Sequence, residues 1–374
     1  MVSFSHGIDP ARMLTVAAVG DVIMHDRLQK YAAGHEDGFY AMMEPVADII
    51  RAADVSFANL EGPAAAGVTA RGRRVKEPEG RYDGMVYAGY PSFNYHPSIA
   101  ADLKRTGFDV VLTANNHALD RLSAGADGTV RTLTEAGLPF TGSRARNDKD
   151  RPWHTITPVD AAAGKFNIAW LGCTYGVNEQ PDPHGQILNC FEDRDVILEE
   201  IGALRARKDV HGVIFAPHWG TEYRHKPNKK QKALAHDALD AGAIAVLGTH
   251  SHVVSPWEKY VTKDGRETFI TYSLGNFVSN QEGLARRASL ILLLGLMPDA
   301  TGEELTVAAA GWIPIHMYRA DGKGIEGPIY AEAIDRTDGR KTAMDLLLKH
   351  LPAENIHPPT TDFWAGAACR PLIS

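Results

Sequence analysis

Metal-binding residue types follow five short apolar runs of this sequence, and each run has the length and composition of a buried strand. The first two runs lead into carboxylates, the third into two amides and a histidine, and the last two into histidines. Groups at the carboxyl ends of neighbouring strands converge at one edge of an open α/β sheet. Carboxylate, amide and imidazole ligands together suit divalent metals of hard to borderline character. The five segments are Gly20-Asp21, Asn59-Leu60-Glu61, Asn115-Asn116-His117, His218-Trp219-Gly220 and His250-Ser251-His252, after the runs Met13–Val19, Val55–Ala58, Val110–Leu112, Val213–Phe215 and Ile244–Leu247.

Each segment has a structural alternative when it is considered alone. Asp21 suits the N-cap of a helix, Glu61 suits a solvated loop, and Asn116 suits an Asx turn. A single histidine after a strand, such as His218, is often a hydrogen-bonded structural residue. The His250-Ser251-His252 segment is the strongest single signal, because both rings can enter one cleft if the backbone turns there. All of these alternatives would have to hold at once for the chain to lack a metal site, so the sequence predicts one.

The composition is that of a globular protein with a large core. The chain has 374 residues, of which 44% are hydrophobic and 23% are charged, and an α/β chain of this length can form a single domain. The net charge of -7 and the pI near 6.1 argue against nucleic acid as a partner. The basic segment Arg71–Lys76 lies in a glycine-rich loop, where it is either solvated or in contact with an anionic substrate.

The cysteines and the hydropathy pattern bear on the compartment. Cys173, Cys190 and Cys369 form neither a disulfide framework nor a zinc-binding pattern. Cys173 ends an apolar run and is expected as a small core residue, and a bridge between Cys173 and Cys190 stays open as the alternative. No apolar stretch has the length of a membrane span, and residues 1–13 lack the pattern of an export signal. The protein is expected to be cytoplasmic if its N-terminus is native and extracytoplasmic if an export signal has been removed.

Strands and helices alternate along most of the chain, which is typical of an α/β fold. The helix expected over 38–53 places Met42, Val46, Ile49 and Ile50 on one apolar face. Further helices are expected at 98–106, 127–136, 193–207 and 229–241.

Consecutive strands replace this alternation in the last third of the chain. Residues 267–276 and 288–297 are expected to pair as antiparallel strands, and a further strand is expected at 304–319. The pattern predicts mixed sheets with helices outside them. We predict one domain over 13–320 and a C-terminal extension over 321–374.

Several strings of this sequence closely resemble motifs of the CapA family, which is named for capsule and poly-γ-glutamate biosynthesis and is related to the calcineurin-like metallophosphoesterases. VGDVIM at 19–24, NLEG at 59–62 and TANNHALD at 113–120 match its first three motifs in order. The resemblance covers roughly residues 13–280. The later strings are PHWGTEY at 217–223, KPNKKQ at 226–231, LGTHSHVV at 247–254 and YSLGNF at 272–277.

The resemblance implies an α/β fold of the metallophosphoesterase type, a four-layer α/β/β/α sandwich with mixed sheets. It also implies two divalent metal ions (Mn, Fe or Zn) at the strand ends. His117 is implied as the acid that protonates the leaving group. The implied ligands are Asp21 and His252 for metal one, Glu61 as the bridge, and Asn116, His218 and His250 for metal two.

The chain departs from the wider phosphoesterase pattern at its first motif. That pattern is Asp-x-His, whereas position 23 here is Ile, so metal one loses an imidazole and is expected to be weak or absent. His25 either replaces the missing ligand or lies on a helix surface. The bridging residue is Glu61, whereas the usual bridge is an aspartate, and the longer side chain reaches one methylene further.

Two classes of function follow from the resemblance. The first is a metal-dependent hydrolase of phosphoesters or of γ-glutamyl polymer, in which Arg286 or Arg287 stabilises developing charge. The second is a non-hydrolytic accessory protein that binds anionic poly-γ-glutamate during synthesis or export. Either takes an anionic small molecule or polymer, and the oligomeric state stays open. The candidate substrate-binding residues are Glu222 and Tyr223, which otherwise form a solvated rim, Asn276, which otherwise supports the histidine turn, and Asn115.

Overall fold

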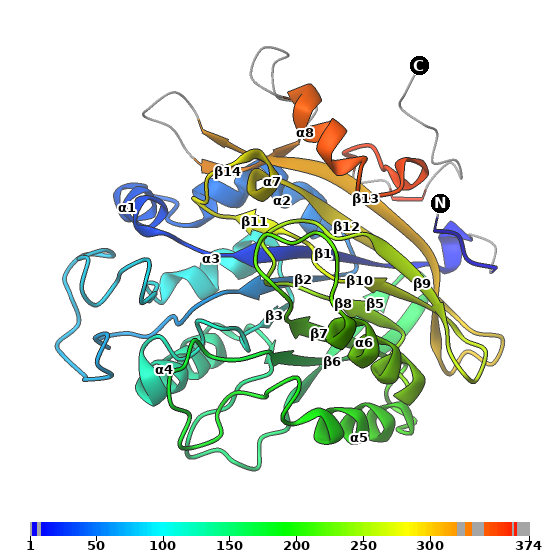
Figure 1. The fold of residues 1–374 in the computed structure, drawn as a ribbon, viewed down its shortest axis with the longest axis horizontal. Coiled ribbons are helices and arrows are strands. Elements are labelled where there is room, and N and C mark those ends of the chain that lie inside the picture. The colour runs from blue at the N-terminus through cyan, green and yellow to red at the C-terminus, as the bar shows by residue number, and fades with distance from the viewer. Residues whose placement is uncertain (1, 6–8, 320–325, 331–339, 361–362, 365–374) are drawn as a thin grey trace.

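The fold consists of two mixed β-sheets that pack face to face, with helices on the outer face of each (Figure 1). The computed structural model describes residues 2–5, 9–319, 326–330, 340–360 and 363–364. Separate apolar clusters fill the space between the sheets and the space beneath each helical layer. The predicted four-layer α/β/β/α sandwich is therefore confirmed.

The first sheet contains a long strand that is buried over its whole length. Its strands are β1 (Leu14–Val22), β2 (Val55–Leu60), β3 (Val110–Leu112), β4 (Phe140–Thr141), β11 (Asn276–Val278), β12 (Ala288–Pro298), β13 (Leu305–Arg319) and β14 (Glu326–Tyr330). They take the order β14-β13-β12-β1-β2-β3-β4, and β11 pairs with β1. All nine residues of β1 are buried, as expected for a strand that is covered on both faces.

The second sheet carries the histidine-bearing strand ends. Its strands are β5 (His154–Ala161), β6 (Gly164–Thr174), β7 (Gly212–His218), β8 (Ala245–Leu247), β9 (Trp257–Val261) and β10 (Glu267–Thr271). They take the order β5-β6-β7-β8-β10-β9. The ring of Phe57 in β2 stacks on that of Trp170 in β6, with centroids 5.5 Å apart, so the two sheets interlock through large buried side chains.

The helices cover the sheets through apolar faces that the sequence pattern indicates. The predicted apolar face of α2 is confirmed, because its four residues are all buried: Met42, Val46, Ile49 and Ile50. The outer helices of the first sheet are α1 (Asp26–Gly34), α2 (Tyr40–Ala52), α3 (Ser98–Thr106) and α4 (Leu122–Ala136), and those of the second are α5 (Arg194–Arg205) and α6 (Lys229–Ala241). The smaller elements are η1 (Pro10–Arg12), α7 (Leu284–Arg287), α8 (Arg340–Leu347) and η2 (Ala353–Asn355).

The expected pairing of residues 267–276 with 288–297 is wrong. β10 lies in the second sheet beside β8 and β9, whereas β12 lies in the first sheet beside β1 and β13. The chain between them crosses from one sheet to the other at 272–275. Both strands are buried apolar runs, so their periodicity carries no information about which sheet each one joins.

Helix α4 begins at Leu122, five residues before the expected start at 127. Gly125 and Gly128 lower the helical propensity of this stretch. Their purpose is close packing, because a Cβ added at Gly128 would lie 2.4 Å from the Cβ of Ala65. The glycines let the helix approach the chain that follows β2.

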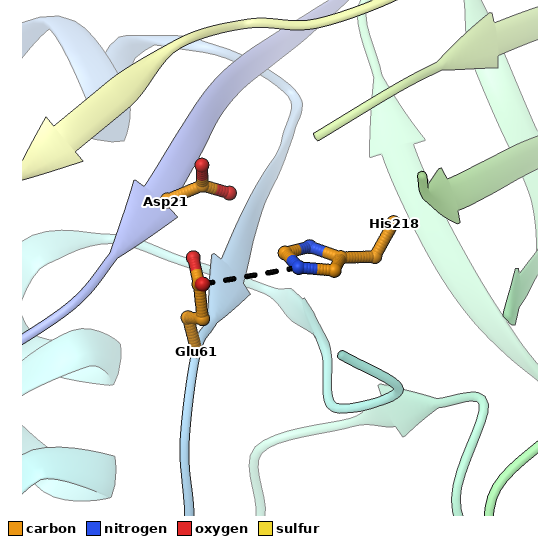
Figure 2. Close-up of side chains that lie close together, drawn as sticks. All are labelled: Asp21, Glu61 and His218. Carbon is orange, nitrogen blue, oxygen red and sulfur yellow. Dashed lines mark ion pairs between the residues drawn. The ribbon is translucent and has the colours of Figure 1, made fainter. Parts of the chain in front are cut away.

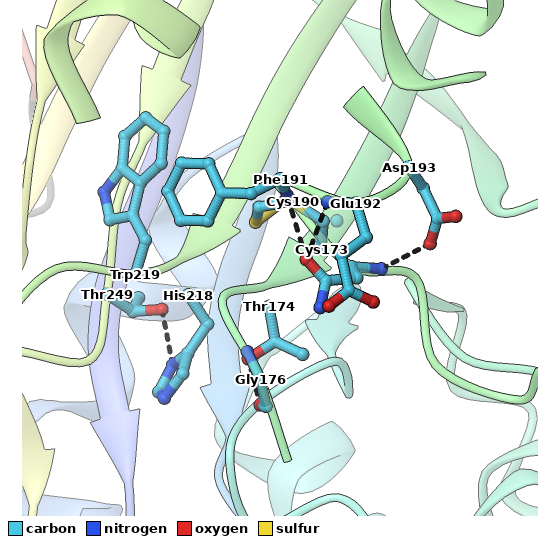
Figure 3. The surroundings of a disulfide bond; sticks show 12 residues. Cys173, Thr174, Gly176, Cys190, Phe191, Glu192, Asp193, His218, Trp219 and Thr249 are labelled. Atoms are coloured by element: carbon cyan, nitrogen blue, oxygen red, sulfur yellow. Dashed lines mark hydrogen bonds between the residues drawn. A yellow bond between two sulfur atoms is a disulfide. The ribbon is translucent and has the colours of Figure 1, made fainter. Parts of the chain in front are cut away.

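Cys173 is buried, as expected, but it is bonded to Cys190 (Figure 3). The bridge that the sequence left open is therefore present, and the expectation of an unbonded core cysteine is wrong. The segment 175–189 leaves the end of β6 and returns to it, where Cys190 N donates to Thr174 O at 2.8 Å. This return brings the two Cα atoms to 5.0 Å, which the spacing of the cysteines alone does not reveal. Cys369 lies outside the described residues.

The C-terminal segment packs against the first sheet. Trp312 Nε1 in β13 donates to Pro352 O at 2.9 Å, and Asn355 Nδ2 donates to Ala310 O at 2.7 Å. The expected helix at 342–350 corresponds to α8. The predicted boundary at residues 320 and 321 falls outside the described residues, so the division into domain and extension stays a prediction. None of the described helices combines the length and apolar character needed to cross a bilayer.

Candidate metal centre

The carboxyl ends of strands from both sheets meet at one place in the sandwich. Asp21 is the penultimate residue of β1, Glu61 follows β2 directly, and His218 is the last residue of β7 in the other sheet. Figure 2 shows their side chains pointing toward one another across the gap between the sheets. One ligand atom from each lies within 4.8 Å of the others, and no other group of this kind occurs among the described residues.

The close approach of two backbone segments fixes Asp21. A Cβ at Gly20 would lie 1.7 Å from Gly275 O, so only glycine permits this contact, and Asp21 N donates to the same oxygen at 3.0 Å. Asn59 and Asn276 lie in register on either side of Asp21. Asn59 Nδ2 donates to Asp21 Oδ1 at 2.8 Å. The carboxylate is thus held from its flanks, and its other oxygen faces the centre.

Glu61 is the least satisfied polar group of this cluster. Its side chain is fully buried, and neither carboxylate oxygen accepts a hydrogen bond from the described part of the chain. Burial and the charge of Asp21 raise the pKa of Glu61 well above its usual value. Leaving a buried carboxylate without a partner is costly, and a bound cation is the partner that its surroundings fit.

His218 and His250 face Glu61 from the second sheet. His218 Nε2 lies 3.2 Å from His250 Nδ1, 2.9 Å from Asn116 Oδ1 and 3.8 Å from Glu61 Oε1. Burial and then the neighbouring histidines hold the pKa values of both rings well below their usual range. Neutral imidazoles are the form that binds metals. With its proton on Nδ1, the His218 ring donates to Thr249 Oγ1 at 3.0 Å and leaves the Nε2 lone pair toward the centre.

A strained turn brings His250 and His252 to the same side. Both residues have left-handed backbone angles, φ 96° and φ 58°, which non-glycine residues rarely adopt. This is the turn that both rings need in order to enter one cleft. The ring centroids of the two histidines lie 6.0 Å apart.

His252 lies beside the two carboxylates. Its Nδ1 is 3.0 Å from Asp21 Oδ2 and 3.0 Å from Asn276 Oδ1, and its Nε2 is 3.8 Å from Glu61 Oε1. Burial lowers the pKa of His252, but the charges of Glu61 and Asp21 outweigh burial and raise it to about 9. When protonated, His252 forms a buried ion pair with Asp21.

His117 is held against the centre by its own motif. Its Nδ1 lies 2.8 Å from Asp120 Oδ2, and the same oxygen accepts from Phe93 N at 2.7 Å. The Phe93 ring packs edge-on against the His117 ring at 4.8 Å. Asp120 thereby favours the tautomer with the proton on Nδ1 and fixes the direction of Nε2. Asp120, three residues after His117, was not among the predicted site residues.

The segment 175–189 supplies further residues that the sequence analysis missed. The Tyr175 ring lies 4.5 Å from that of His250, and Asn178 Oδ1 accepts from Asn116 Nδ2 at 3.3 Å. Figure 3 shows the disulfide that ends this segment close to His218 and Thr249. The flanking cysteines are the only signal in the sequence that this segment returns to the site.

Two of the predicted substrate-binding residues are engaged within the protein. Asn276 Oδ1 lies 3.0 Å from His252 Nδ1. Asn276 Nδ2 donates to Gln281 Oε1 at 3.1 Å and to Arg286 O at 3.0 Å. Asn115 is fully buried and donates to Leu60 O at 2.8 Å. These contacts place Asn276 and Asn115 as supports of the strand ends around the centre.

The other two, Glu222 and Tyr223, are exposed at the rim of the centre. Tyr223 N donates to Ser251 O at 2.8 Å, and the Tyr223 ring lies 6.0 Å from that of His252. The rim also includes Arg286, whose guanidinium lies 4.6 Å from the Tyr223 ring centroid. Arg287, the other candidate arginine, points elsewhere and donates from Nε and Nη2 to Met317 O.

The structure also places positions 23 and 25 of the first motif. Ile23 is 2% exposed and belongs to the apolar cluster under the outer helices. His25 Nδ1 contacts Ile23 O at 3.2 Å and accepts from Asn280 N at 3.3 Å, and its ring packs on Phe93 at 5.4 Å. The first motif therefore offers Asp21 alone to the candidate metal-binding group, whose other members are Glu61 and His218.

Solved structures with a partly similar fold include two from Thermus thermophilus. Sulfate thiohydrolase SoxB in complex with glycerol aligns with a TM-score of 0.44 and 12% identity, over 92% of this chain and 62% of that one. The protein TT1561 aligns with a TM-score of 0.37 and 11% identity, over 79% of this chain and 98% of that one.

Sequence comparison identifies curated relatives in two bacilli. The capsule biosynthesis protein CapA of Bacillus anthracis is 30% identical over 203 residues, which are 53% of this chain and 47% of that protein. The PGA biosynthesis protein CapA of Bacillus subtilis (strain 168) is 28% identical over 294 residues, which are 78% of this chain and 70% of that protein. The match thus spans about half the length of the first relative. The family model of the bacterial capsule synthesis protein PGA_cap matches residues 15–281, and the chain belongs to this family.

Proposed function

We propose that this chain is a metal-dependent hydrolase that acts on phosphoesters or on γ-glutamyl polymer through a dinuclear metal site. The observation that carries the proposal is Glu61, a fully buried carboxylate with no hydrogen-bond partner among the described residues. The nearest groups across from it are imidazole nitrogens of His218 and His252, each 3.8 Å from Oε1. A carboxylate between two such groups is suited to bridge two cations.

The side chains divide into two ligand sets that share Glu61. Asn116, His218 and His250 form the set for metal two, and their ligand atoms lie within 2.9 to 3.2 Å of His218 Nε2. Asp21 and His252 form the set for metal one. This second set is poorer, because Ile23 is packed into the apolar cluster and contributes no imidazole. We therefore expect metal two to bind more tightly than metal one.

The surrounding residues then have defined tasks in hydrolysis. A pair of divalent cations at such a site lowers the pKa of water and stabilises negative charge on a phosphoryl or carbonyl oxygen. In its doubly protonated form, His117 presents Nε2–H to the substrate, donates that proton to the leaving group and is left with its remaining proton on Nδ1. Asp120 keeps the His117 proton on Nδ1 in the neutral ring through the 2.8 Å contact. Tyr175 and Asn178 close the site on the side of His250 and Asn116 and reduce the access of water.

A polymer-binding accessory protein is the second candidate. The observation that favours it is the incomplete set around metal one, because a single metal binds anions without the full chemistry of two. The name of the Bacillus subtilis relative refers to PGA biosynthesis, so poly-γ-glutamate is the polymer to test.

The test is a turnover screen of the purified chain loaded with Mn, Fe or Zn, against phosphoesters and γ-glutamyl peptides. The hydrolase proposal requires turnover that His117→Ala strongly reduces on substrates with a poor leaving group, while the metal content stays unchanged. If the metal-loaded protein turns over none of these compounds but binds poly-γ-glutamate, and His117→Ala binds it equally well, the accessory function is correct.

A further inference from the structure

The rim of the metal centre carries the guanidinium of Arg286, one of the two arginines predicted to stabilise developing charge. That role would lower kcat for every substrate in a variant of Arg286, whereas a role in recognising a second group of the substrate changes KM. Arg286 lies in α7, and the described residues place no carboxylate within 4.0 Å of it. Its guanidinium lies 4.6 Å from the Tyr223 ring centroid, and the Tyr223 hydroxyl interacts with it and with the Glu222 carboxylate. Arg286 is partly exposed, so its charge is open to a ligand at the rim.

The position of Arg286 is fixed relative to the centre. Asn276 Nδ2 donates to Arg286 O at 3.0 Å, and Asn276 Oδ1 lies 3.0 Å from His252 Nδ1. One side chain thus connects the backbone of Arg286 to the histidine of metal one. Tyr223 is anchored independently, since its N donates to Ser251 O between the two histidines of the turn. The arginine and the tyrosine are therefore both linked by hydrogen bonds to the turn that carries His250 and His252.

The neighbouring arginine shows what a structural role looks like at this place. Both Nε and Nη2 of Arg287 donate to Met317 O, at 2.9 and 2.8 Å, and tie α7 to β13. Arg286 makes no comparable backbone bond with its guanidinium in the described part of the chain. Stacking on an aromatic ring holds a guanidinium flat and leaves its N–H edge available to an oxyanion.

The electrostatics of the rim determine the charge of the ligand that it favours. Arg286 adds positive charge at the rim of a centre that is proposed to hold divalent cations, and Glu222, which interacts with the Tyr223 hydroxyl, offsets only part of this charge, so the rim favours an anionic ligand. The group that is cleaved lies at the metals themselves. An anion at Arg286 is then a second one on the same substrate molecule.

We propose that Arg286 and Tyr223 form a subsite for a second anionic group of the substrate, a carboxylate or phosphate outside the bond that is cleaved. The inference rests on the proposed function, because it takes the metal centre as the place of reaction. The substrate class is then a molecule with at least two anionic groups, such as a polyanionic chain. Neutral or singly charged esters and amides are poor substrates.

The test compares paired substrates that differ only in the second anion. One pair is a γ-glutamyl anilide with a free α-carboxylate and its α-amide. The other is a nitrophenyl phosphodiester with and without a terminal phosphate. We expect Arg286→Gln to raise KM by about tenfold or more for the doubly anionic member of one pair, with kcat and metal content unchanged. KM for the matched member without the second anion changes little, and the pair that responds identifies carboxylate or phosphate.

Two further variants separate recognition from general charge and from folding. Arg286→Lys keeps the charge but loses the flat guanidinium and is expected to recover part of the lost affinity. Arg224→Gln removes an equal charge from an exposed residue next to Tyr223 and is expected to leave both members of each pair unchanged. An equal change in KM for both members in Arg286→Gln, or no preference for the second anion in the wild type, overturns the subsite.

The subsite can be tested even if the chain proves not to be a hydrolase. Absence of turnover on all four compounds contradicts the proposed function alone. Calorimetry of the metal-loaded protein with poly-γ-glutamate oligomers and with short polyphosphates then measures binding directly. Loss of about tenfold or more in affinity for one of them in Arg286→Gln supports the subsite, and equal affinity of Arg286→Gln and wild type for both overturns it.

Discussion

His218 Nε2 lies 3.2 Å from His250 Nδ1 in the interior of the protein, although the residues are 32 positions apart. Two imidazoles at this distance cannot both carry a proton between them, and burial lowers the pKa of each ring. Asn116 Oδ1 and Glu61 Oε1 approach the same nitrogen of His218. This convergence of lone pairs is the geometric basis of the proposed metal two.

Thr249→Val tests whether the direction of the His218 ring matters for metal binding. Thr249 Oγ1 is 3.0 Å from His218 Nδ1, and loss of such an orienting contact typically weakens a metal site about 10- to 100-fold. We expect a weakening of this size for Zn or Mn in competition titrations with a chelator. The exposed Thr221→Val is the matched control. Unchanged affinity in Thr249→Val would show that the contact from Thr249 does not orient His218 for metal binding.

His117→Asn is expected to have an effect that depends on the leaving group. A proton donor contributes roughly 10²- to 10⁴-fold where the leaving group is a poor one, and little where it leaves readily as an anion. The expected outcome is a large loss of kcat on alkyl esters or amides and a small loss on nitrophenyl esters. Asp120→Asn should follow the same trend with smaller losses, because it acts through the 2.8 Å contact to His117. Equal losses on all leaving groups would exclude His117 as the acid.

The disulfide is expected to stabilise the segment that covers the site. Cys173 and Cys190 are 17 residues apart, and closing a loop of this size contributes about 3 kcal/mol to the free energy of unfolding. The double variant Cys173→Ala, Cys190→Ala should lose roughly this amount in denaturant unfolding monitored by circular dichroism. Its metal-two affinity should also fall, because Asn178 holds Asn116. A reductant should weaken the wild type but not the double variant, and equal responses of the two proteins would contradict the account.

The predicted ligands that converge on the centre could be found because each lies at the end of an apolar run with the length and composition of a buried strand. Asp21 and His218 illustrate this, since the run before each is buried throughout in the structure. The family resemblance added the proposed assignment of each side chain to metal one, to metal two or to the bridge. The four-layer architecture was likewise predictable from the alternation of strands and helices together with that resemblance.

Asn178 and Tyr175 were not predictable in the same way. They lie in an irregular segment whose path depends on a disulfide and on backbone bonds to distant strands, such as Tyr175 N to His218 O at 2.9 Å. No periodicity records such contacts. The predicted pairing of β10 with β12 was wrong for a related reason. The apolar sequence of a buried strand shows that both of its faces are covered, but it does not show which strands lie beside it.

The central claim is that Glu61 binds a metal ion. It is tested most directly by the stability of a Glu61→Gln variant with and without metal. Glu61→Gln removes a buried charge without a hydrogen-bond partner, so the metal-free variant should be more stable than the metal-free wild type by roughly 1–3 kcal/mol. The order should reverse with metal, because the wild type gains the free energy of cation binding and the variant gains little. The measurement is thermal unfolding of both proteins with chelator and with saturating Mn or Zn, together with metal content per chain. The account predicts this crossover and up to two ions in the wild type. Equal metal content and equal stabilisation of the two proteins, or a wild type that binds no metal, would contradict it.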